Sequence, residues 1–144
     1  MNQSRGISLL EVALAVSVSL MLTAGGIYAY RQHLHSTKIT QAKLMLETMR
    51  QGVETTRYRI GRYPSLLEMQ NNLDPMGQKV YDFGNRRRRD PFYPPTNPNA
   101  DSPIAAYAAV TPPYGGWLYQ AGPPYVLVPK LPDADFPGDK PSEW

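Results

Sequence analysis

The side chains that usually perform catalysis are scarce in this sequence and poorly placed for it. The chain contains no cysteine, and none of its serines lies in a nucleophile-elbow context. Its two histidines, His33 and His35, are two positions apart, so on a helix they point to different faces and would not bind one metal ion together. No catalytic constellation is recognisable. The sequence therefore argues against an enzyme, including one anchored in a membrane, and predicts no metal ligands and no cofactor.

The strongest local charge is a run of four adjacent arginines, Arg86 to Arg89. Like charges repel, so such a run is expected in a solvated loop. Phosphate recognition by DNA-binding proteins uses basic side chains, but no DNA-binding motif surrounds this run and no aromatic residue interrupts it. We interpret the run as a solvated loop. Docking to an acidic partner or to lipid headgroups is the first alternative, and contact with DNA is a weaker one.

A single carboxylate, Glu11, interrupts an otherwise uncharged stretch of 24 residues, Ile7 to Tyr30. As a helix this stretch would be about 36 Å long, enough to cross a hydrocarbon core of roughly 30 Å. An acidic side chain at the centre of a membrane costs about 2.5 kcal/mol or more. A buried anion needs a cationic partner. In a bundle of identical segments, the amino terminus of a neighbouring copy would supply one.

The residues Gly6-Ile7-Ser8-Leu9-Leu10-Glu11-Val12 resemble the type IV prepilin signal, which pilins share with the pseudopilins of type II secretion. This resemblance implies that a prepilin peptidase cleaves after Gly6 and that Ile7 becomes a methylated N-terminus. It also implies that Glu11 helps to assemble subunits into a helical filament. The sequence departs from the commonest pattern at Ile7, where Phe is usual, and at Ser8, where Thr is usual.

A second, independent resemblance lies further along the chain. The residues Gly61-Arg62-Tyr63-Pro64, followed by Leu66-Leu67-Glu68, look like the corresponding place in major pseudopilins. Those proteins carry a calcium-binding loop near the C-terminus. The aspartates Asp133, Asp135 and Asp139 could supply oxygen ligands, although their spacing matches no calcium loop that can be transferred residue by residue.

The elements that must position these residues begin with one long helix from about Ile7 to Ile60. In its second half the apolar residues share one face at helical spacing, while basic and acidic residues share the other. This apolar face comprises Ala42, Met45, Leu46, Met49, Val53 and Ile60. Gly25 and Gly26 weaken the first half. They are either a packing surface against another helix or a soft spot that bends when the subunit leaves the bilayer. Gly52 is interpreted as a residue that slightly weakens the second half of the helix.

The rest of the chain predicts a small head with several short elements. Gly61 is expected to cap the long helix. Ser65 and Glu68 form a capping box for a short helix from about Leu66 to Asn72. Residues 80–83 are interpreted as a short strand and 74–77 as a turn, while residues 104–110 could be a strand or a helical turn. Residues 114–119 and 125–128 predict a hairpin with a five-residue loop, in which Trp117 and Tyr119 point into the core.

These elements predict an α+β fold with a long N-terminal helix on a small antiparallel head, and the resemblance implies that the fold is type IV pilin-like. The organisation that the resemblance implies is a leader peptide over 1–6, a transmembrane and assembly helix over 7–30 and a periplasmic domain over 31–144. Residues 31–89 carry 12 basic and 5 acidic residues, whereas residues 90–144 carry 2 and 6, so the chain could dock head to tail or simply present two differently solvated faces.

The resemblance implies a subunit of a type II secretion pseudopilus or a related filament, in the bacterial inner membrane. Its partners would be copies of itself or related subunits, the prepilin peptidase, membrane lipid, and an inner-membrane assembly platform with its ATPase. The alternative function is a surface or competence pilin that binds DNA or a surface through Arg86 to Arg89.

Overall fold

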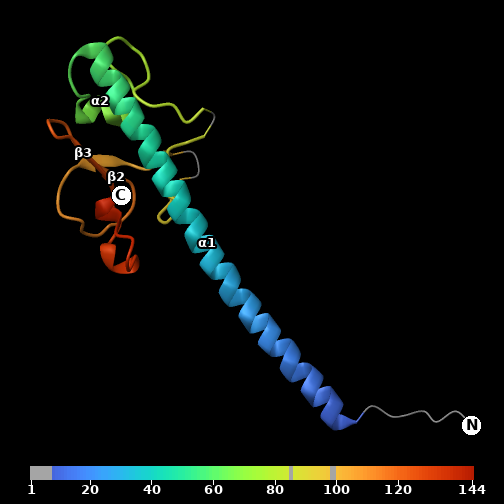
Figure 1. The fold of residues 1–144 in the computed structure, drawn as a ribbon. Helices are drawn as coiled ribbons and strands as arrows, with labels where there is room; N and C mark the ends of the chain where they lie inside the picture. The colour runs from blue at the N-terminus through green and yellow to red at the C-terminus, as the bar shows by residue number, and fades with distance from the viewer. Residues whose placement is uncertain (1–7, 85, 98–99) are drawn as a thin grey trace, which may run out of the picture. The chain divides into compact units, whose positions relative to one another are not determined.

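The computed structural model of the chain describes residues 8–84, 86–97 and 100–144. The chain divides into two compact units, Met1–Thr37 and Lys38–Trp144, and each is described by itself. Helix α1 (Leu9–Ile60) begins in the first unit and ends in the second. The second unit adds helix α2 (Leu66–Asn71), three strands and two short 3-10 helices (Figure 1). The strands are β1 (Ile104–Ala106), β2 (Trp117–Gln120) and β3 (Val126–Pro129), and the 3-10 helices are η1 (Asp133–Asp135) and η2 (Pro141–Glu143).

Helix α1 agrees closely with the helix expected from the sequence. It starts directly after Ser8, and Gly61 ends it in a left-handed conformation with φ of 75°. The Gly61 N–H donates to the Arg57 carbonyl oxygen at 2.8 Å, which is the expected C-terminal cap. The N-terminal part of α1 is long and apolar enough to cross a membrane. These observations establish one long, apolar N-terminal helix joined to an α+β domain.

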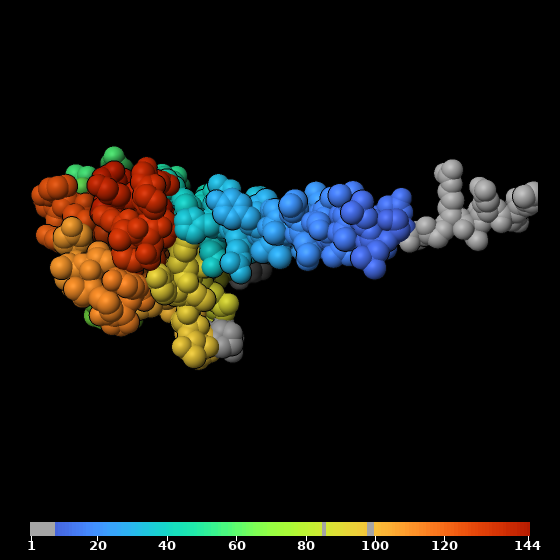
Figure 2. All heavy atoms as spheres, turned by 90° about the horizontal axis from the view of Figure 1, so that it is seen from below, coloured from blue at the N-terminus to red at the C-terminus, as the bar shows by residue number. Residues whose placement is uncertain are grey.

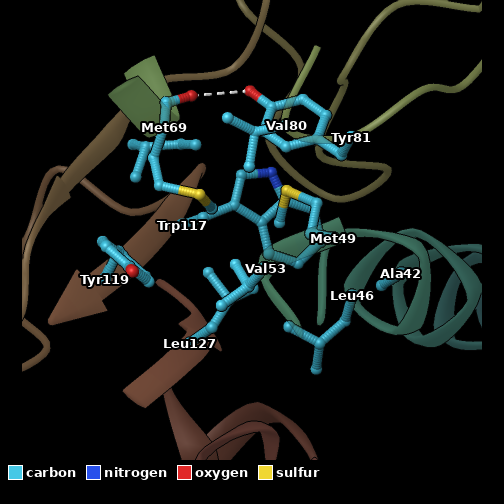
Figure 3. Packing of buried hydrophobic residues seen from close by; sticks show 11 residues of the cluster. Ala42, Leu46, Met49, Val53, Met69, Val80, Tyr81, Trp117, Tyr119 and Leu127 are labelled. Atoms are coloured by element: carbon cyan, nitrogen blue, oxygen red, sulfur yellow. Dashed lines mark hydrogen bonds between the residues drawn. The ribbon is translucent and has the colours of Figure 1, made fainter. Parts of the chain in front are cut away.

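Within the second unit, one face of α1 forms a wall of the hydrophobic core (Figure 3). Most of the predicted face is buried, but Met45 and Ile60 are only partly buried and Thr56 is buried instead. The buried side chains of α1 are Ala42, Leu46, Met49, Val53 and Thr56. Trp117 and Tyr119 from β2 lie in the same cluster, as their shared face predicted. Fully burying an apolar side chain contributes about 1.5–3 kcal/mol, so this cluster holds the sheet against the helix.

The sheet has the strand order β1-β2-β3 and is mixed. Strands β2 and β3 form the predicted antiparallel hairpin, with Gln120 opposite Val126. Strand β1 resolves the ambiguity over residues 104–110 in favour of a strand, and it pairs parallel to β2 with Ile104 opposite Trp117. The expectation of an antiparallel head was therefore wrong for this pair. The loop that connects β1 to β2 is rich in proline and glycine and contains no crossover helix. It brings the chain back so that β2 runs parallel to β1.

Helix α2 begins at the predicted capping box. The Ser65 Oγ accepts the Glu68 N–H at 3.3 Å, and the Glu68 carboxylate accepts the Ser65 N–H at 2.7 Å. The helix ends one residue earlier than predicted, because Asn72 adopts the left-handed conformation at its C-cap. The Glu68 carboxylate also receives two hydrogen bonds from the Arg62 guanidinium, at 2.9 and 2.5 Å. Glu68 thus links Arg62 and Ser65, and it holds the connection between α1 and α2 together.

The stability of the folded protein depends on pH through Glu68, and the direction of this dependence follows from the pKa of Glu68. The hydrogen bonds from Arg62, with those from Ser65, lower the pKa of Glu68 below its ordinary value of 4.5. The stability that Glu68 contributes is therefore present above pH 4.5 and is lost as the pH falls through the lowered pKa. We expect Glu68→Gln, which keeps an acceptor for the Ser65 N–H, to lose less stability than the wild type between pH 5 and 3. Urea unfolding of the detergent-solubilised protein measures this, and parallel curves for the two proteins would contradict it.

Residues 80–83 do not form the predicted strand. They pass directly over α1 in an irregular conformation, and Val80 and Tyr81 are buried. The close approach occurs at Gly52, where an added Cβ atom would lie 2.3 Å from the Val80 carbonyl oxygen. Gly52 is therefore a contact position on α1, and the interpretation of this glycine as a residue that only weakens the helix was wrong. The predicted turn at residues 74–77 is present, with the Gly77 N–H donating to the Asp74 carbonyl oxygen at 2.9 Å.

Candidate functional site

The first candidate site is the start of α1, which Glu11 helps to cap. The Glu11 Oε2 atom accepts the Ser8 N–H at 2.9 Å, and the Ser8 Oγ accepts the Leu10 N–H at 3.2 Å. These bonds satisfy N–H groups that have no partner within the helix. A carboxylate in the first turn also interacts favourably with the helix dipole. Glu11 thus has a local role that the sequence analysis missed, although Ser8 and Glu11 have the spacing of a capping box before an apolar run. The predicted cleavage and methylation residues, Gly6 and Ile7, lie outside the described residues.

The apolar side chains that follow Glu11 are exposed along the first unit. They cover the helix on all sides, so the described part of this unit contains no core of its own. The exposed large residues here are Leu9, Leu10, Val12, Leu14, Val16, Val18, Leu20, Met21, Leu22, Ile27, Tyr28 and Tyr30. A helix that is apolar all round requires an apolar environment. Such an environment is supplied by a lipid bilayer or by other helices of the same kind.

Gly25 and Gly26 lie within the continuous helix. No atom lies within 4 Å of a Cβ placed at either position. Both faces of the glycine pair are therefore accessible to another helix. Close packing and a soft spot both remain predictions for this pair.

The second candidate site is the arginine run, which the structure divides into different environments. Arg86 and Arg87 are exposed, Arg88 is 6% exposed, and Arg89 is intermediate. The expectation that all four occupy a solvated loop was therefore wrong for Arg88. Its Nε atom donates to the Ser102 carbonyl oxygen at 2.8 Å, and its Nη1 atom contacts the Tyr81 hydroxyl. Burial lowers the pKa of Arg88 from its ordinary value, and these acceptors offset part of that cost.

Asp90, two residues after Arg88, is a buried residue that joins the loop following it to the segment before β2. The sequence analysis did not predict this role. Its carboxylate is 1% exposed and accepts the N–H groups of Phe92, Tyr93 and Gly116, at 2.8, 3.2 and 3.0 Å. The Asp90 N–H donates to the Ser102 Oγ at 2.7 Å. Burial raises the pKa of Asp90, although the three backbone N–H groups oppose this shift. The Asp-Pro pair predicts a local turn at this position, but nothing local predicts the contact with Gly116.

Two of the three C-terminal aspartates, Asp139 and Asp133, have hydrogen-bond partners within the protein. Asp139 binds the Lys43 ammonium through both oxygens, at 2.7 and 2.9 Å, and accepts the Trp144 Nε1–H at 2.9 Å. Asp133 accepts the N–H and the hydroxyl of Ser142, at 3.1 and 2.6 Å. Among the described residues, no three acidic, histidine or cysteine side chains lie close enough to hold a metal ion. Calcium binding remains a prediction from the resemblance alone, and a thermal shift in millimolar calcium would test it.

These contacts fasten the C-terminal segment to the second half of α1. The Lys43 ammonium lies 5.0 Å from the centroid of the Trp144 ring, and Trp144 packs edge-on against Phe136. The Arg50 guanidinium donates to the Leu127 carbonyl oxygen at 3.1 Å and contacts the Trp144 carbonyl oxygen. The segment that carries the acidic residues is therefore held in a defined position on the second unit.

Comparison of the chain with protein-family models, with curated proteins and with solved structures finds no match.

Proposed function

We propose that this protein is a structural subunit of a type IV pilin-like filament, closest in pattern to a pseudopilin of type II secretion. In this proposal a prepilin peptidase removes residues 1–6, and Ile7 becomes the methylated N-terminus. The subunit waits in the bacterial inner membrane with its C-terminal domain in the periplasm. An assembly platform with its ATPase then extracts it into the filament. The subunit performs no catalysis.

The observation that carries this proposal is the apolar helix after Ser8, whose side chains are exposed on every face and include a single carboxylate. A plain membrane anchor would need no Glu11, and the carboxylate makes insertion less favourable. In a filament, however, helices of neighbouring copies would surround Glu11, and the amino terminus of an adjacent Ile7 would neutralise it. The pair would set the axial register between subunits. The acidic residue thus has a use in the assembled state that offsets its cost in the bilayer.

Glu11→Ala is expected to leave membrane insertion intact and to reduce filament assembly at least about tenfold. The physical reason is that the variant leaves the neighbouring amino terminus buried without a counter-ion; a tenfold loss corresponds to about 1.4 kcal/mol, and breaking a buried pair typically costs more than that. The measurement is the amount of sheared filament per amount of membrane-bound subunit.

Ser8→Ala is the matched control, because Glu11 also contributes to the start of α1. This variant removes the hydroxyl that accepts the Leu10 N–H but keeps the carboxylate. We expect it to assemble within about twofold of the wild type, since a lost cap costs roughly 1 kcal/mol. Equal loss in both variants would show that Glu11 acts only as a cap. The intact mass of the membrane protein provides a second test: a chain that retains Met1 to Gly6 would overturn the prepilin assignment.

A further inference from the structure

Arg86 and Arg87 form an exposed basic pair on the second unit. The Arg86 N–H donates to the Phe83 carbonyl oxygen at 3.2 Å, and the next residue after the pair, Arg88, is anchored in the interior. In the part of the chain that the structure describes, neither Arg86 nor Arg87 forms an ion pair. Two adjacent guanidinium groups are therefore exposed to solvent and are paired with no carboxylate of the described residues.

The C-terminal segment presents the opposite charge. Residues 133–143 contain four carboxylates and one lysine. Asp139 is used internally by Lys43, and Asp133 by Ser142. Asp135 is exposed and makes no ion pair with any described residue, while Glu143 makes a single exposed contact with Lys140 at 3.6 Å. Asp135 and Glu143 are thus the carboxylates of this segment that are available to a partner. We call Asp135 and Glu143 the acidic pair, and Arg86 and Arg87 the basic pair.

Within one copy the two pairs do not bind each other. The segments that carry them adjoin in Figure 2, where the rings of Phe92 and Phe136 are 4.9 Å apart. No ion pair between described residues, however, joins the basic pair to the acidic pair. One copy therefore leaves both pairs unused, but two copies side by side can join the basic pair of one to the acidic pair of the other. This contact joins two different surfaces. Each copy can therefore bind one neighbour through its basic pair and another neighbour through its acidic pair, so the contact can repeat along a filament.

We propose that Arg86 and Arg87 of one copy dock onto Asp135 and Glu143 of a neighbouring copy in the filament. This inference rests on the proposed filament function and adds the partner surface of the second unit. Arginine suits the role, because its planar guanidinium can bind a carboxylate with two hydrogen bonds. Charge pairs across an interface contribute more to the choice of partner and register than to raw affinity. The contact thus orients the domains, while the apolar helices supply most of the attraction.

Charge reversal in the full-length protein tests this proposal. Arg86→Glu with Arg87→Glu, and separately Asp135→Lys with Glu143→Lys, are each expected to lower filament yield about tenfold, because each places like charges opposite one another. All four changes in one chain restore complementary pairs and are expected to return the yield to within about threefold of the wild type. Arg86→Lys with Arg87→Lys keeps the charge and is the matched control, expected to stay within about threefold.

A cross-linking experiment identifies the partner directly, since the chain contains no cysteine. Cells expressing one subunit with Arg87→Cys and another with Asp135→Cys should yield a cross-linked dimer with a short bismaleimide, and neither subunit alone should. Normal assembly of both charge reversals would overturn the inference while leaving the filament proposal intact, provided that Glu11→Ala still fails. Loss in the arginine variant without rescue by the fourfold variant would also overturn it, and would favour another anionic partner such as DNA.

Discussion

Replacing Gly52 with alanine is expected to destabilise the second unit by up to about 2 kcal/mol. The added Cβ would lie 2.3 Å from the Val80 carbonyl oxygen and 2.9 Å from the Tyr81 Cβ. One of these contacts is with backbone, so a side-chain rotation cannot relieve it, and overpacking of this kind typically costs 1–3 kcal/mol. The gain in helix propensity from Gly to Ala, roughly 1 kcal/mol, offsets only part of the cost. Because single domains are stable by about 5–15 kcal/mol, urea unfolding followed by tryptophan fluorescence would detect the shift easily.

Gly25→Ala is the matched control on the same helix. No atom lies within 4 Å of the added Cβ, so the variant keeps only the propensity term and should be neutral or slightly stabilising. Equal stability of the Gly52→Ala protein and the wild type would mean that the segment over α1 lies further from the helix than described. The same control informs on the glycine pair, because a subunit that needs a soft spot there should extract less readily when the helix is stiffened.

Asp90→Ala is expected to cost about 2–3 kcal/mol, the second large effect. The Asp90 carboxylate is the acceptor for three backbone N–H groups, and its removal takes this acceptor from the buried N–H of Gly116 and from the part-buried N–H groups of Phe92 and Tyr93. Each unsatisfied buried donor costs about 1–3 kcal/mol, although water entering the cavity would recover part of this. The loop after Arg89 and the start of β2 should loosen together. Hydrogen exchange at Phe92 and Gly116, measured on the detergent-solubilised protein, reports both ends of the junction.

Asp90→Asn separates hydrogen bonding from charge. Its carbonyl oxygen can still accept the N–H groups of Phe92 and Tyr93, but its amide would face the Gly116 N–H donor-to-donor. We expect an intermediate loss of stability, with exchange accelerated mainly at Gly116. If both variants were as stable as the wild type, Asp90 would not be the junction of these loops.

Elements whose cause is local were predicted correctly from the sequence. The apolar face of α1 repeats at helical spacing, and the Ser65 and Glu68 pair forms a capping box within four residues. The hairpin of β2 and β3 has strand-forming residues on both sides of a loop with Gly122 and two prolines. In each case the physical reason lies within one or two turns of chain, so the residue pattern contains it.

Features that depend on distant partners were missed. Arg88 is buried because Tyr81 and Ser102 supply acceptors that stand 7 and 14 residues away. Asp90 is buried because of Gly116, which is 26 residues away. A run of four arginines suggests a uniform environment, but Arg86 and Arg87 are exposed, Arg88 is buried and Arg89 is half-buried. Likewise, the parallel pairing of β1 depends on the path of a loop that has no periodic pattern.

The strands that pack against α1 are synthesised long after α1 itself. Arg50 binds the carbonyl oxygen of Leu127, 77 residues later, and the core side chains of α1 wait for the same strands. At about 5–20 residues per second, synthesis of that interval takes roughly 4–15 s. Throughout it, the apolar stripe of α1 from Ala42 to Val53 has no sheet to cover it. A chain that ends before Leu127 should therefore be cleaved by protease within this stripe, whereas the full-length chain should be protected there.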